Sequence, residues 1–109
     1  MVKTRVIEDT EIMDIVNQYV VKVCENYKVE TIILFGSYAK GTNHQDSDID
    51  IAIITDDFEN SIFDEELNLT KLRRNIDLRI EPHLFRVEEF NNIETPLIQE
   101  IVDTGIRVA

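Results

Sequence analysis

Two short apolar runs on either side of a polar loop constrain the fold of this chain more than any other feature. Residues 31–35 (TIILF) are β-branched and apolar and lead directly into Gly36, a pattern typical of a buried strand. Residues 48–54 (DIDIAII) predict a second strand after the loop. We expect both runs to belong to one β-sheet.

Helical patterns lie before, between and after the predicted strands. Residues 61–74 open with a sequence that resembles a capping box. Residues 95–105 begin with a threonine cap and a proline in the first turn, and end with a glycine just past the last turn. Residues 9–27 start at a cap formed by Asp9 or Thr10 and carry apolar side chains at helical spacing, namely Ile12, Ile15, Val16, Tyr19, Val20 and Val23.

A third strand is predicted over residues 75–81, where apolar and charged side chains alternate until Pro82 stops the strand. Residues 106–108 can add a brief last strand. The order is helix, strand, strand, helix, strand, helix, which indicates an α/β (α+β) fold with a small mixed sheet flanked by helices. Without an internal repeat or a linker-like segment, residues 1–109 are predicted to form a single domain.

The charge balance narrows the classes of partner. The chain has 11 Lys and Arg residues against 22 Asp and Glu residues and a net charge of −11, so autonomous binding to nucleic acid is not expected. An acidic surface suits a basic protein partner, or simply keeps the protein soluble. There is no apolar run of about eighteen residues and no secretory start, so we expect a cytoplasmic protein without a membrane span. The single cysteine, Cys24, excludes an internal disulfide.

Gly36 and Ser37 form a candidate phosphate-binding turn. Gly36 follows the first strand and allows a sharp turn with no side chain in the way of a ligand. Ser37 would begin a short helical turn that Gly41 closes, and the N–H groups and hydroxyl at a helix start suit phosphate oxygens. A plain tight turn is the alternative interpretation.

Three acidic residues are candidate metal ligands. Asp48 and Asp50 are two residues apart on a strand, so their carboxylates point to the same face and repel each other unless a cation lies between them. In the alternating pattern of the third strand, the Asp77 side chain points away from the core, to the polar face of the sheet. It would join Asp48 and Asp50 if this strand lies beside the second strand. Mg²⁺ prefers such carboxylates, and two ions require a cluster of this kind. An exposed acidic pair, and an Asp77 paired with Arg79, are the alternatives.

Residues 36–41 (GSYAKG), followed by residues 47–53 (SDIDIAI), resemble the signature of the polymerase-β-like nucleotidyltransferase superfamily. The small size resembles its minimal nucleotidyltransferase (MNT) branch. The resemblance implies that Gly36 and Ser37 hold the triphosphate of ATP, and that Asp48 and Asp50 bind two Mg²⁺ ions. It also implies that an aspartate on a following strand, a place that Asp77 fits, binds the ion that activates the acceptor.

Several residues near these motifs are given no firm role in the predicted site. Lys40 can reach a phosphate oxygen or be an ordinary surface lysine. Arg79 can meet phosphate or the acceptor, although mutual pairing of Arg79 and Glu81 is the favoured expectation. The two histidines, His44 and His83, lack companions spaced for zinc and are expected to be solvated loop residues.

The resemblance also implies an acceptor. Minimal nucleotidyltransferases are commonly encoded beside a helical HEPN protein, and as antitoxins they transfer AMP to a tyrosine hydroxyl of that toxin. A small-molecule acceptor, as in antibiotic-modifying relatives, is a second enzyme hypothesis. The alternative from another class is an acidic binding module that neutralises its partner by covering it. The base preference, the number of nucleotides added and the oligomeric state stay open.

Overall fold

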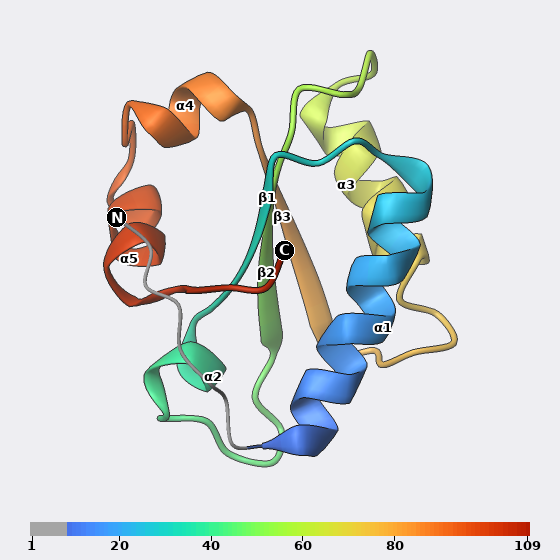
Figure 1. Ribbon diagram of the computed structural model, residues 1–109, viewed down its shortest axis with the longest axis vertical. Helices are drawn as coiled ribbons and strands as arrows, with labels where there is room; N and C mark the ends of the chain where they lie inside the picture. Colours follow the sequence, from blue (N-terminus) through green and yellow to red (C-terminus); the bar gives the residue numbers. More distant parts are fainter. Residues whose placement is uncertain (1–8) are drawn as a thin grey trace.

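The computed structural model describes residues 9–109, which form a central sheet between two helical layers (Figure 1). The helices and strands, in chain order, are α1 (Thr10–Asn26), β1 (Thr31–Phe35), α2 (Ser37–Lys40), β2 (Ile49–Ile54), α3 (Ile62–Lys71), β3 (Ile80–Phe85), α4 (Val87–Asn91), α5 (Pro96–Thr104) and β4 (Ile106–Arg107).

The sheet is mixed, with strand order β3-β2-β1-β4. β1 runs antiparallel to both β2 and β4, whereas β2 and β3 are parallel. The parallel pair requires a crossover, because a tight hairpin can join only antiparallel strands, and α3 lies in that crossover. The predicted fold class, a small mixed sheet flanked by helices, is confirmed.

The two faces of the sheet carry separate apolar clusters. On the face covered by α1 and α3, residues of both helices pack on every second residue of the strands, including Ile49, Ile51 and Ile53 of β2. On the opposite face, residues of α5 pack on Ala52, Ile54 and their neighbours. Figure 1 shows α1 and α3 on one side of the sheet and α4 and α5 on the other. β2 is therefore apolar on both faces, except at its second residue, Asp50.

The helix caps are those that the sequence predicts. The Asp9 carboxylate accepts a hydrogen bond from the Ile12 N–H (3.1 Å), and the Ser61 hydroxyl accepts one from Asp64 (3.1 Å). Thr95 caps α5 in the same way, with Pro96 in the first turn. Within residues 9–109, no helix has the length and apolarity that crossing a membrane requires.

The third strand differs from the prediction. It covers Ile80–Phe85 rather than residues 75–81, so Pro82 lies inside the strand instead of ending it. β3 is an edge strand, and the Leu84 N–H points away from β2 to the Glu66 carboxylate (2.9 Å). Pro82 has the same parity as Leu84, so its missing N–H falls on the outer side and removes no hydrogen bond of the sheet.

Candidate active site

The candidate site lies where β2 and β3 begin. Asp50 is the second residue of β2 and lies opposite Glu81 of β3 in the parallel register. Side chains alternate along a strand, so both residues continue the face that α5 covers further along the sheet. Asp48, immediately before β2, has the same parity as Asp50 and lies close enough to Glu81 for its carboxylate to add to the effect of desolvation in raising the pKa of Glu81. Three carboxylates therefore converge at one end of the sheet.

His83 lies beside this carboxylate group. Its Nε2 atom is 3.4 Å from Asp50 Oδ1 and 3.9 Å from Glu81 Oε1. Its ring packs edge-on against Phe35, with the ring centroids 5.0 Å apart. One donor atom from each of Asp50, Glu81 and His83 lies within 4.8 Å of the others, a spacing that can hold a metal ion.

The local electrostatics disfavour full ionisation of the cluster. Partial desolvation first, and then the neighbouring Asp48 and Asp50 carboxylates, raise the pKa of Glu81, and only His83 opposes them. Desolvation lowers the pKa of His83, but the hydrogen bond and charge of Asp50, together with nearby glutamates, outweigh it and raise the pKa on balance. The carboxylate neighbours contribute to both shifts, and a bound cation would offset their negative charge.

The Gly36 turn touches this cluster directly. Gly36 has φ 75°, a conformation that favours glycine, and a Cβ atom at this position would overlap the Oδ2 atom of Asp50. Ser37 is the first residue of α2, and Gly41 closes this short helix, as predicted. The proposed phosphate turn and the carboxylates therefore share one small volume, because Gly36 has no side chain to separate them.

Lys40 occupies the surface position that the sequence left as an alternative. Its Nζ atom lies 2.9 Å from Glu100 Oε1, and this ion pair joins α2 to α5. Both side chains are about two-fifths exposed. A phosphate contact by Lys40 stays a prediction.

Asp77 does not lie where the sequence analysis placed it. It precedes β3, and its carboxylate accepts hydrogen bonds from the Arg79 guanidinium at 2.8 and 3.0 Å and from the Arg79 N–H at 2.8 Å. The predicted strand placement of Asp77 is wrong because the chain turns through residues 72–79 and enters the sheet only at Ile80. The expected pairing of Arg79 with Glu81 is also wrong, since Arg79 pairs with Asp77.

Glu81 and His83 are the residues that the sequence analysis missed at this site. The missed signal is the alternation that continues through Pro82: Ile80, Pro82 and Leu84 are buried, whereas Glu81 and His83 are not. His83 is a strand residue beside the carboxylates rather than a solvated loop residue.

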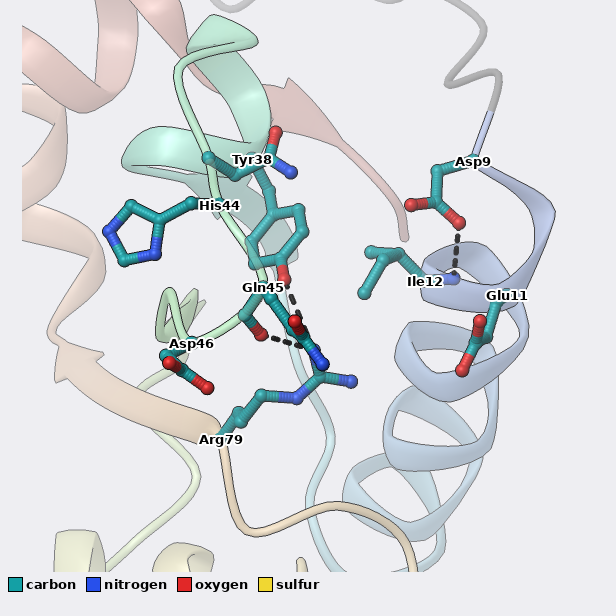
Figure 2. A pocket seen from close by; sticks show the side chains of 9 residues that line it. Asp9, Glu11, Ile12, Tyr38, His44, Gln45, Asp46 and Arg79 are labelled. Atoms are coloured by element: carbon teal, nitrogen blue, oxygen red, sulfur yellow. Dashed lines mark hydrogen bonds between the residues drawn. The ribbon is translucent and has the colours of Figure 1, made fainter.

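A polar pocket of about 580 Å³ lies between the start of α1 and the loop that joins α2 to β2 (Figure 2). Tyr38, Arg79 and loop residues line it together with the start of α1. Ile12 and Tyr38 belong to the apolar face under α1, so this pocket and the carboxylate cluster lie toward opposite faces of the sheet.

With this geometry described, comparisons with known proteins identify the family. A family model described as "Polymerase beta, Nucleotidyltransferase" matches residues 18–109. The chain belongs to this nucleotidyltransferase family. The resemblance inferred from residues 36–41 and 47–53 is thereby confirmed.

Individual relatives agree with the family. A protein adenylyltransferase, MntA, of Shewanella oneidensis is 36% identical over 78 residues, which are 72% of this chain and 52% of that protein. This chain thus spans about half the length of that relative. A putative protein adenylyltransferase of Methanocaldococcus jannaschii is 36% identical over 73 residues, 66% of this chain and 73% of the relative.

Among solved structures, one described as a crystal structure of the toxin–antitoxin with AMP-PNP is similar to this chain, with a TM-score of 0.61 and 31% identity. The similarity covers 84% of this chain and 69% of that one.

Proposed function

We propose that this nucleotidyltransferase transfers AMP from ATP to an acceptor hydroxyl in a Mg²⁺-dependent reaction. The observation that carries the proposal is the convergence of Asp48, Asp50 and Glu81 beside the turn at Gly36. The relatives named as protein adenylyltransferases, and the similar toxin–antitoxin structure with AMP-PNP, support adenylyl transfer.

The residues present fit a hard divalent cation. Carboxylate oxygens are the protein ligands that Mg²⁺ prefers, and Asp48, Asp50 and Glu81 supply them. Donor oxygens of Asp50 and Glu81 lie within 4.8 Å of each other, a spacing that one cation can span. When bound, Mg²⁺ would neutralise phosphate charge and lower the pKa of the acceptor hydroxyl. His83 would orient Asp50 and shield one side of it.

Residues of the chain itself would bind the phosphates and accept the proton. The Ser37 hydroxyl and the first N–H groups of α2 would donate hydrogen bonds to phosphate oxygens, and the bare backbone at Gly36 lets the triphosphate approach Asp50. Glu81, whose side chain is about half exposed at the edge of the cluster, would accept the proton of the acceptor hydroxyl. Catalysis then depends on position and charge, as phosphoryl transfer generally does.

The proposed acceptor is a tyrosine hydroxyl of a HEPN-type protein, with this chain acting as its antitoxin. The similar toxin–antitoxin structure supports a protein acceptor. The net charge of −11 suits a basic partner surface.

The first test is transfer of labelled AMP from ATP in the presence of Mg²⁺ to the protein encoded beside this gene. Label should appear on a tyrosine of that protein, and Asp50→Asn and Glu81→Gln should each reduce the rate by at least about 100-fold, the scale of losing a principal electrostatic group. The matched control, Asp14→Asn, changes an exposed carboxylate on α1 and should leave the rate unchanged.

Two outcomes would contradict the proposal. If neutralisation of the partner persists without label in Asp50→Asn, the chain acts as a binding module. If Glu81→Gln keeps full activity, the proton acceptor lies elsewhere.

A further inference from the structure

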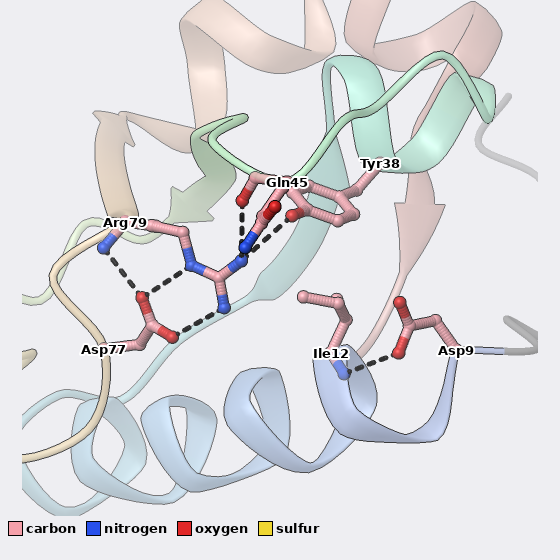
Figure 3. Close-up of polar contacts among 6 residues, drawn as sticks. All are labelled: Asp9, Ile12, Tyr38, Gln45, Asp77 and Arg79. Carbon is pink, nitrogen blue, oxygen red and sulfur yellow. Dashed lines mark hydrogen bonds and ion pairs between the residues drawn. The ribbon is translucent and has the colours of Figure 1, made fainter.

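The Arg79 side chain joins three segments of the chain near the site (Figure 3). Its Nε and Nη2 atoms donate to the Asp77 carboxylate at 3.0 and 2.8 Å. Its Nη1 atom donates to the Tyr38 hydroxyl at 3.2 Å and lies 3.4 Å from the Gln45 carbonyl oxygen. One guanidinium thus connects the segment before β3, the helix α2 and the loop of residues 42–47.

Each of these segments delivers a group of the proposed site. Tyr38 follows Ser37 directly, and the Gln45 carbonyl lies three residues before Asp48. Arg79 itself lies two residues before Glu81, and its carbonyl accepts the Ile49 N–H (2.8 Å) at the start of β2. A shift of any one segment would therefore move the phosphate turn relative to the carboxylates.

The loop of residues 42–47 has few other restraints. Its remaining hydrogen bonds in the described part of the chain are local: Thr42 N–H to the Ser37 carbonyl (3.0 Å), and a turn in which His44 and Ser47 bond each other at 2.9 and 3.0 Å. Residues 42–46 are exposed. Apart from the Thr42 bond to α2, which directly precedes the loop, Arg79 provides the hydrogen bond that holds this loop to another segment among the described residues.

Asp77 fixes the direction of the Arg79 side chain. Two parallel hydrogen bonds from the guanidinium to the Asp77 carboxylate fix the plane of the guanidinium. A third hydrogen bond, from the Arg79 backbone N–H, holds the carboxylate against the turn that contains both residues. Asp77 is only 16% exposed and Arg79 32%, so the pair is shielded from most solvent. Arg79 also holds the pKa of Asp77 below its ordinary value, which keeps the pair charged.

We propose that Arg79, oriented by Asp77, is a positioning residue that holds α2 and the loop of residues 42–47 in register with Glu81. Asp77 then acts through Arg79, not as a metal ligand. The inference rests on the proposed function, because the role given to Arg79 and Asp77 is to position the turn that would bind ATP.

The test compares Asp77→Asn, Arg79→Met and the double variant of the full chain. Amide hydrogen exchange at Thr42, His44 and Ser47 should speed up by about tenfold in each single variant, as expected for the loss of a charge-assisted hydrogen bond. The double variant should show no further change, because both substitutions break one unit. Arg79→Lys should keep more protection than Arg79→Met, since lysine retains the positive charge but cannot form the two parallel hydrogen bonds of a guanidinium.

Two further measurements separate positioning from metal ligation. In AMP transfer, both single variants should raise the KM for ATP by about tenfold and lower kcat far less, because the carboxylates stay in place. The affinity for Mn²⁺ alone, measured by electron paramagnetic resonance, should change equally in Asp77→Asn and Arg79→Met, and much less than in Glu81→Gln. Arg74→Met, an exposed arginine outside this network, is the control.

Two results would overturn the inference: unchanged loop exchange in Arg79→Met, or a loss of Mn²⁺ binding in Asp77→Asn that Arg79→Met does not share. Hydrogen exchange needs no turnover. If the wild-type protein transfers no AMP, the proposed function fails, whereas the coupling of Arg79 to the loop is still tested by the exchange rates.

Discussion

At Gly36 the backbone passes directly beside the Asp50 carboxylate, with φ 75° and no room for a Cβ atom. Gly41 has the same φ but open space around it. Both glycines therefore relieve backbone strain, and only Gly36 also leaves room for a neighbouring functional group.

Gly36→Ala should lower the free energy of unfolding by about 1–3 kcal/mol, the cost of holding an alanine in this backbone region. It should also displace Asp50 and weaken Mn²⁺ binding, because the added methyl would overlap Oδ2. Gly41→Ala is the matched control: it shares the positive φ and should lose stability, but it should bind Mn²⁺ normally. Urea denaturation and Mn²⁺ titration measure the two effects, and normal Mn²⁺ binding by Gly36→Ala would contradict the expectation.

Among the helices and strands, α1 and α3 are joined by a buried polar network centred on Glu65. The Glu65 carboxylate accepts hydrogen bonds from the Tyr27 hydroxyl (2.8 Å) and from Asn60 (2.8 Å) and Asn68 (3.4 Å). Glu65 is only 5% exposed. The bond from Tyr27, followed by that from Asn60, lowers the pKa of Glu65 even though burial opposes it, and desolvation and Glu65 raise the pKa of Tyr27 to about 12.

Glu65→Gln should lower the free energy of unfolding by about 1–3 kcal/mol at neutral pH, because the Tyr27 hydroxyl and the Asn60 amide lose a charged, buried acceptor. The folded-state pKa of Glu65 lies below its ordinary value of 4.5, so its stabilisation is present above 4.5 and is lost as the pH falls through the folded-state value. The difference between wild type and Glu65→Gln should therefore shrink in acid.

Urea denaturation of both proteins at neutral pH and at about pH 3 checks the Glu65 prediction. Glu25→Gln, on the exposed face of α1, is the control and should show no such difference. A gap between Glu65→Gln and wild type that is as large in acid as at neutral pH would rule out the charged acceptor as its cause.

For the whole molecule, the net charge of −11 means that like charges repel in the folded state. Any salt would screen this repulsion. A divalent cation that binds the folded protein at a specific site would stabilise it further, because binding shifts the folding equilibrium toward the folded state. A ligand that binds only the folded state at about 100 times its Kd raises the free energy of unfolding by about 2.7 kcal/mol.

Mg²⁺ should therefore raise the Tm more than NaCl at the same ionic strength, and a chelator should remove the excess. Glu81→Gln should abolish this excess while it keeps the response to NaCl, because only the specific site is changed. Thermal unfolding followed by circular dichroism measures both responses. Equal responses to Mg²⁺ and to ionic-strength-matched NaCl would show that the cluster binds no Mg²⁺.

Local sequence patterns predicted most elements correctly. The caps at Asp9, Ser61 and Thr95 satisfy N–H groups within one turn, so their consequences do not depend on distant residues. The turn at Gly36 and the shared face of Asp48 and Asp50 follow from glycine geometry and strand parity. These features can be predicted because the interactions that decide them lie within a few residues.

The sequence by itself therefore determined the helices other than α4, the first two strands and the motif that identifies the family. Only the tertiary structure decided which acidic residue joins Asp48 and Asp50, because Asp77 and Glu81 have the same parity and differ only in where β3 meets β2. The edge position of β3 lets the strand continue through Pro82, so Glu81 and His83 reach the site. The chain turns before Ile80, so Asp77 lies outside the strand and holds Arg79. Register between strands depends on contacts across the sheet, which no short stretch of sequence contains.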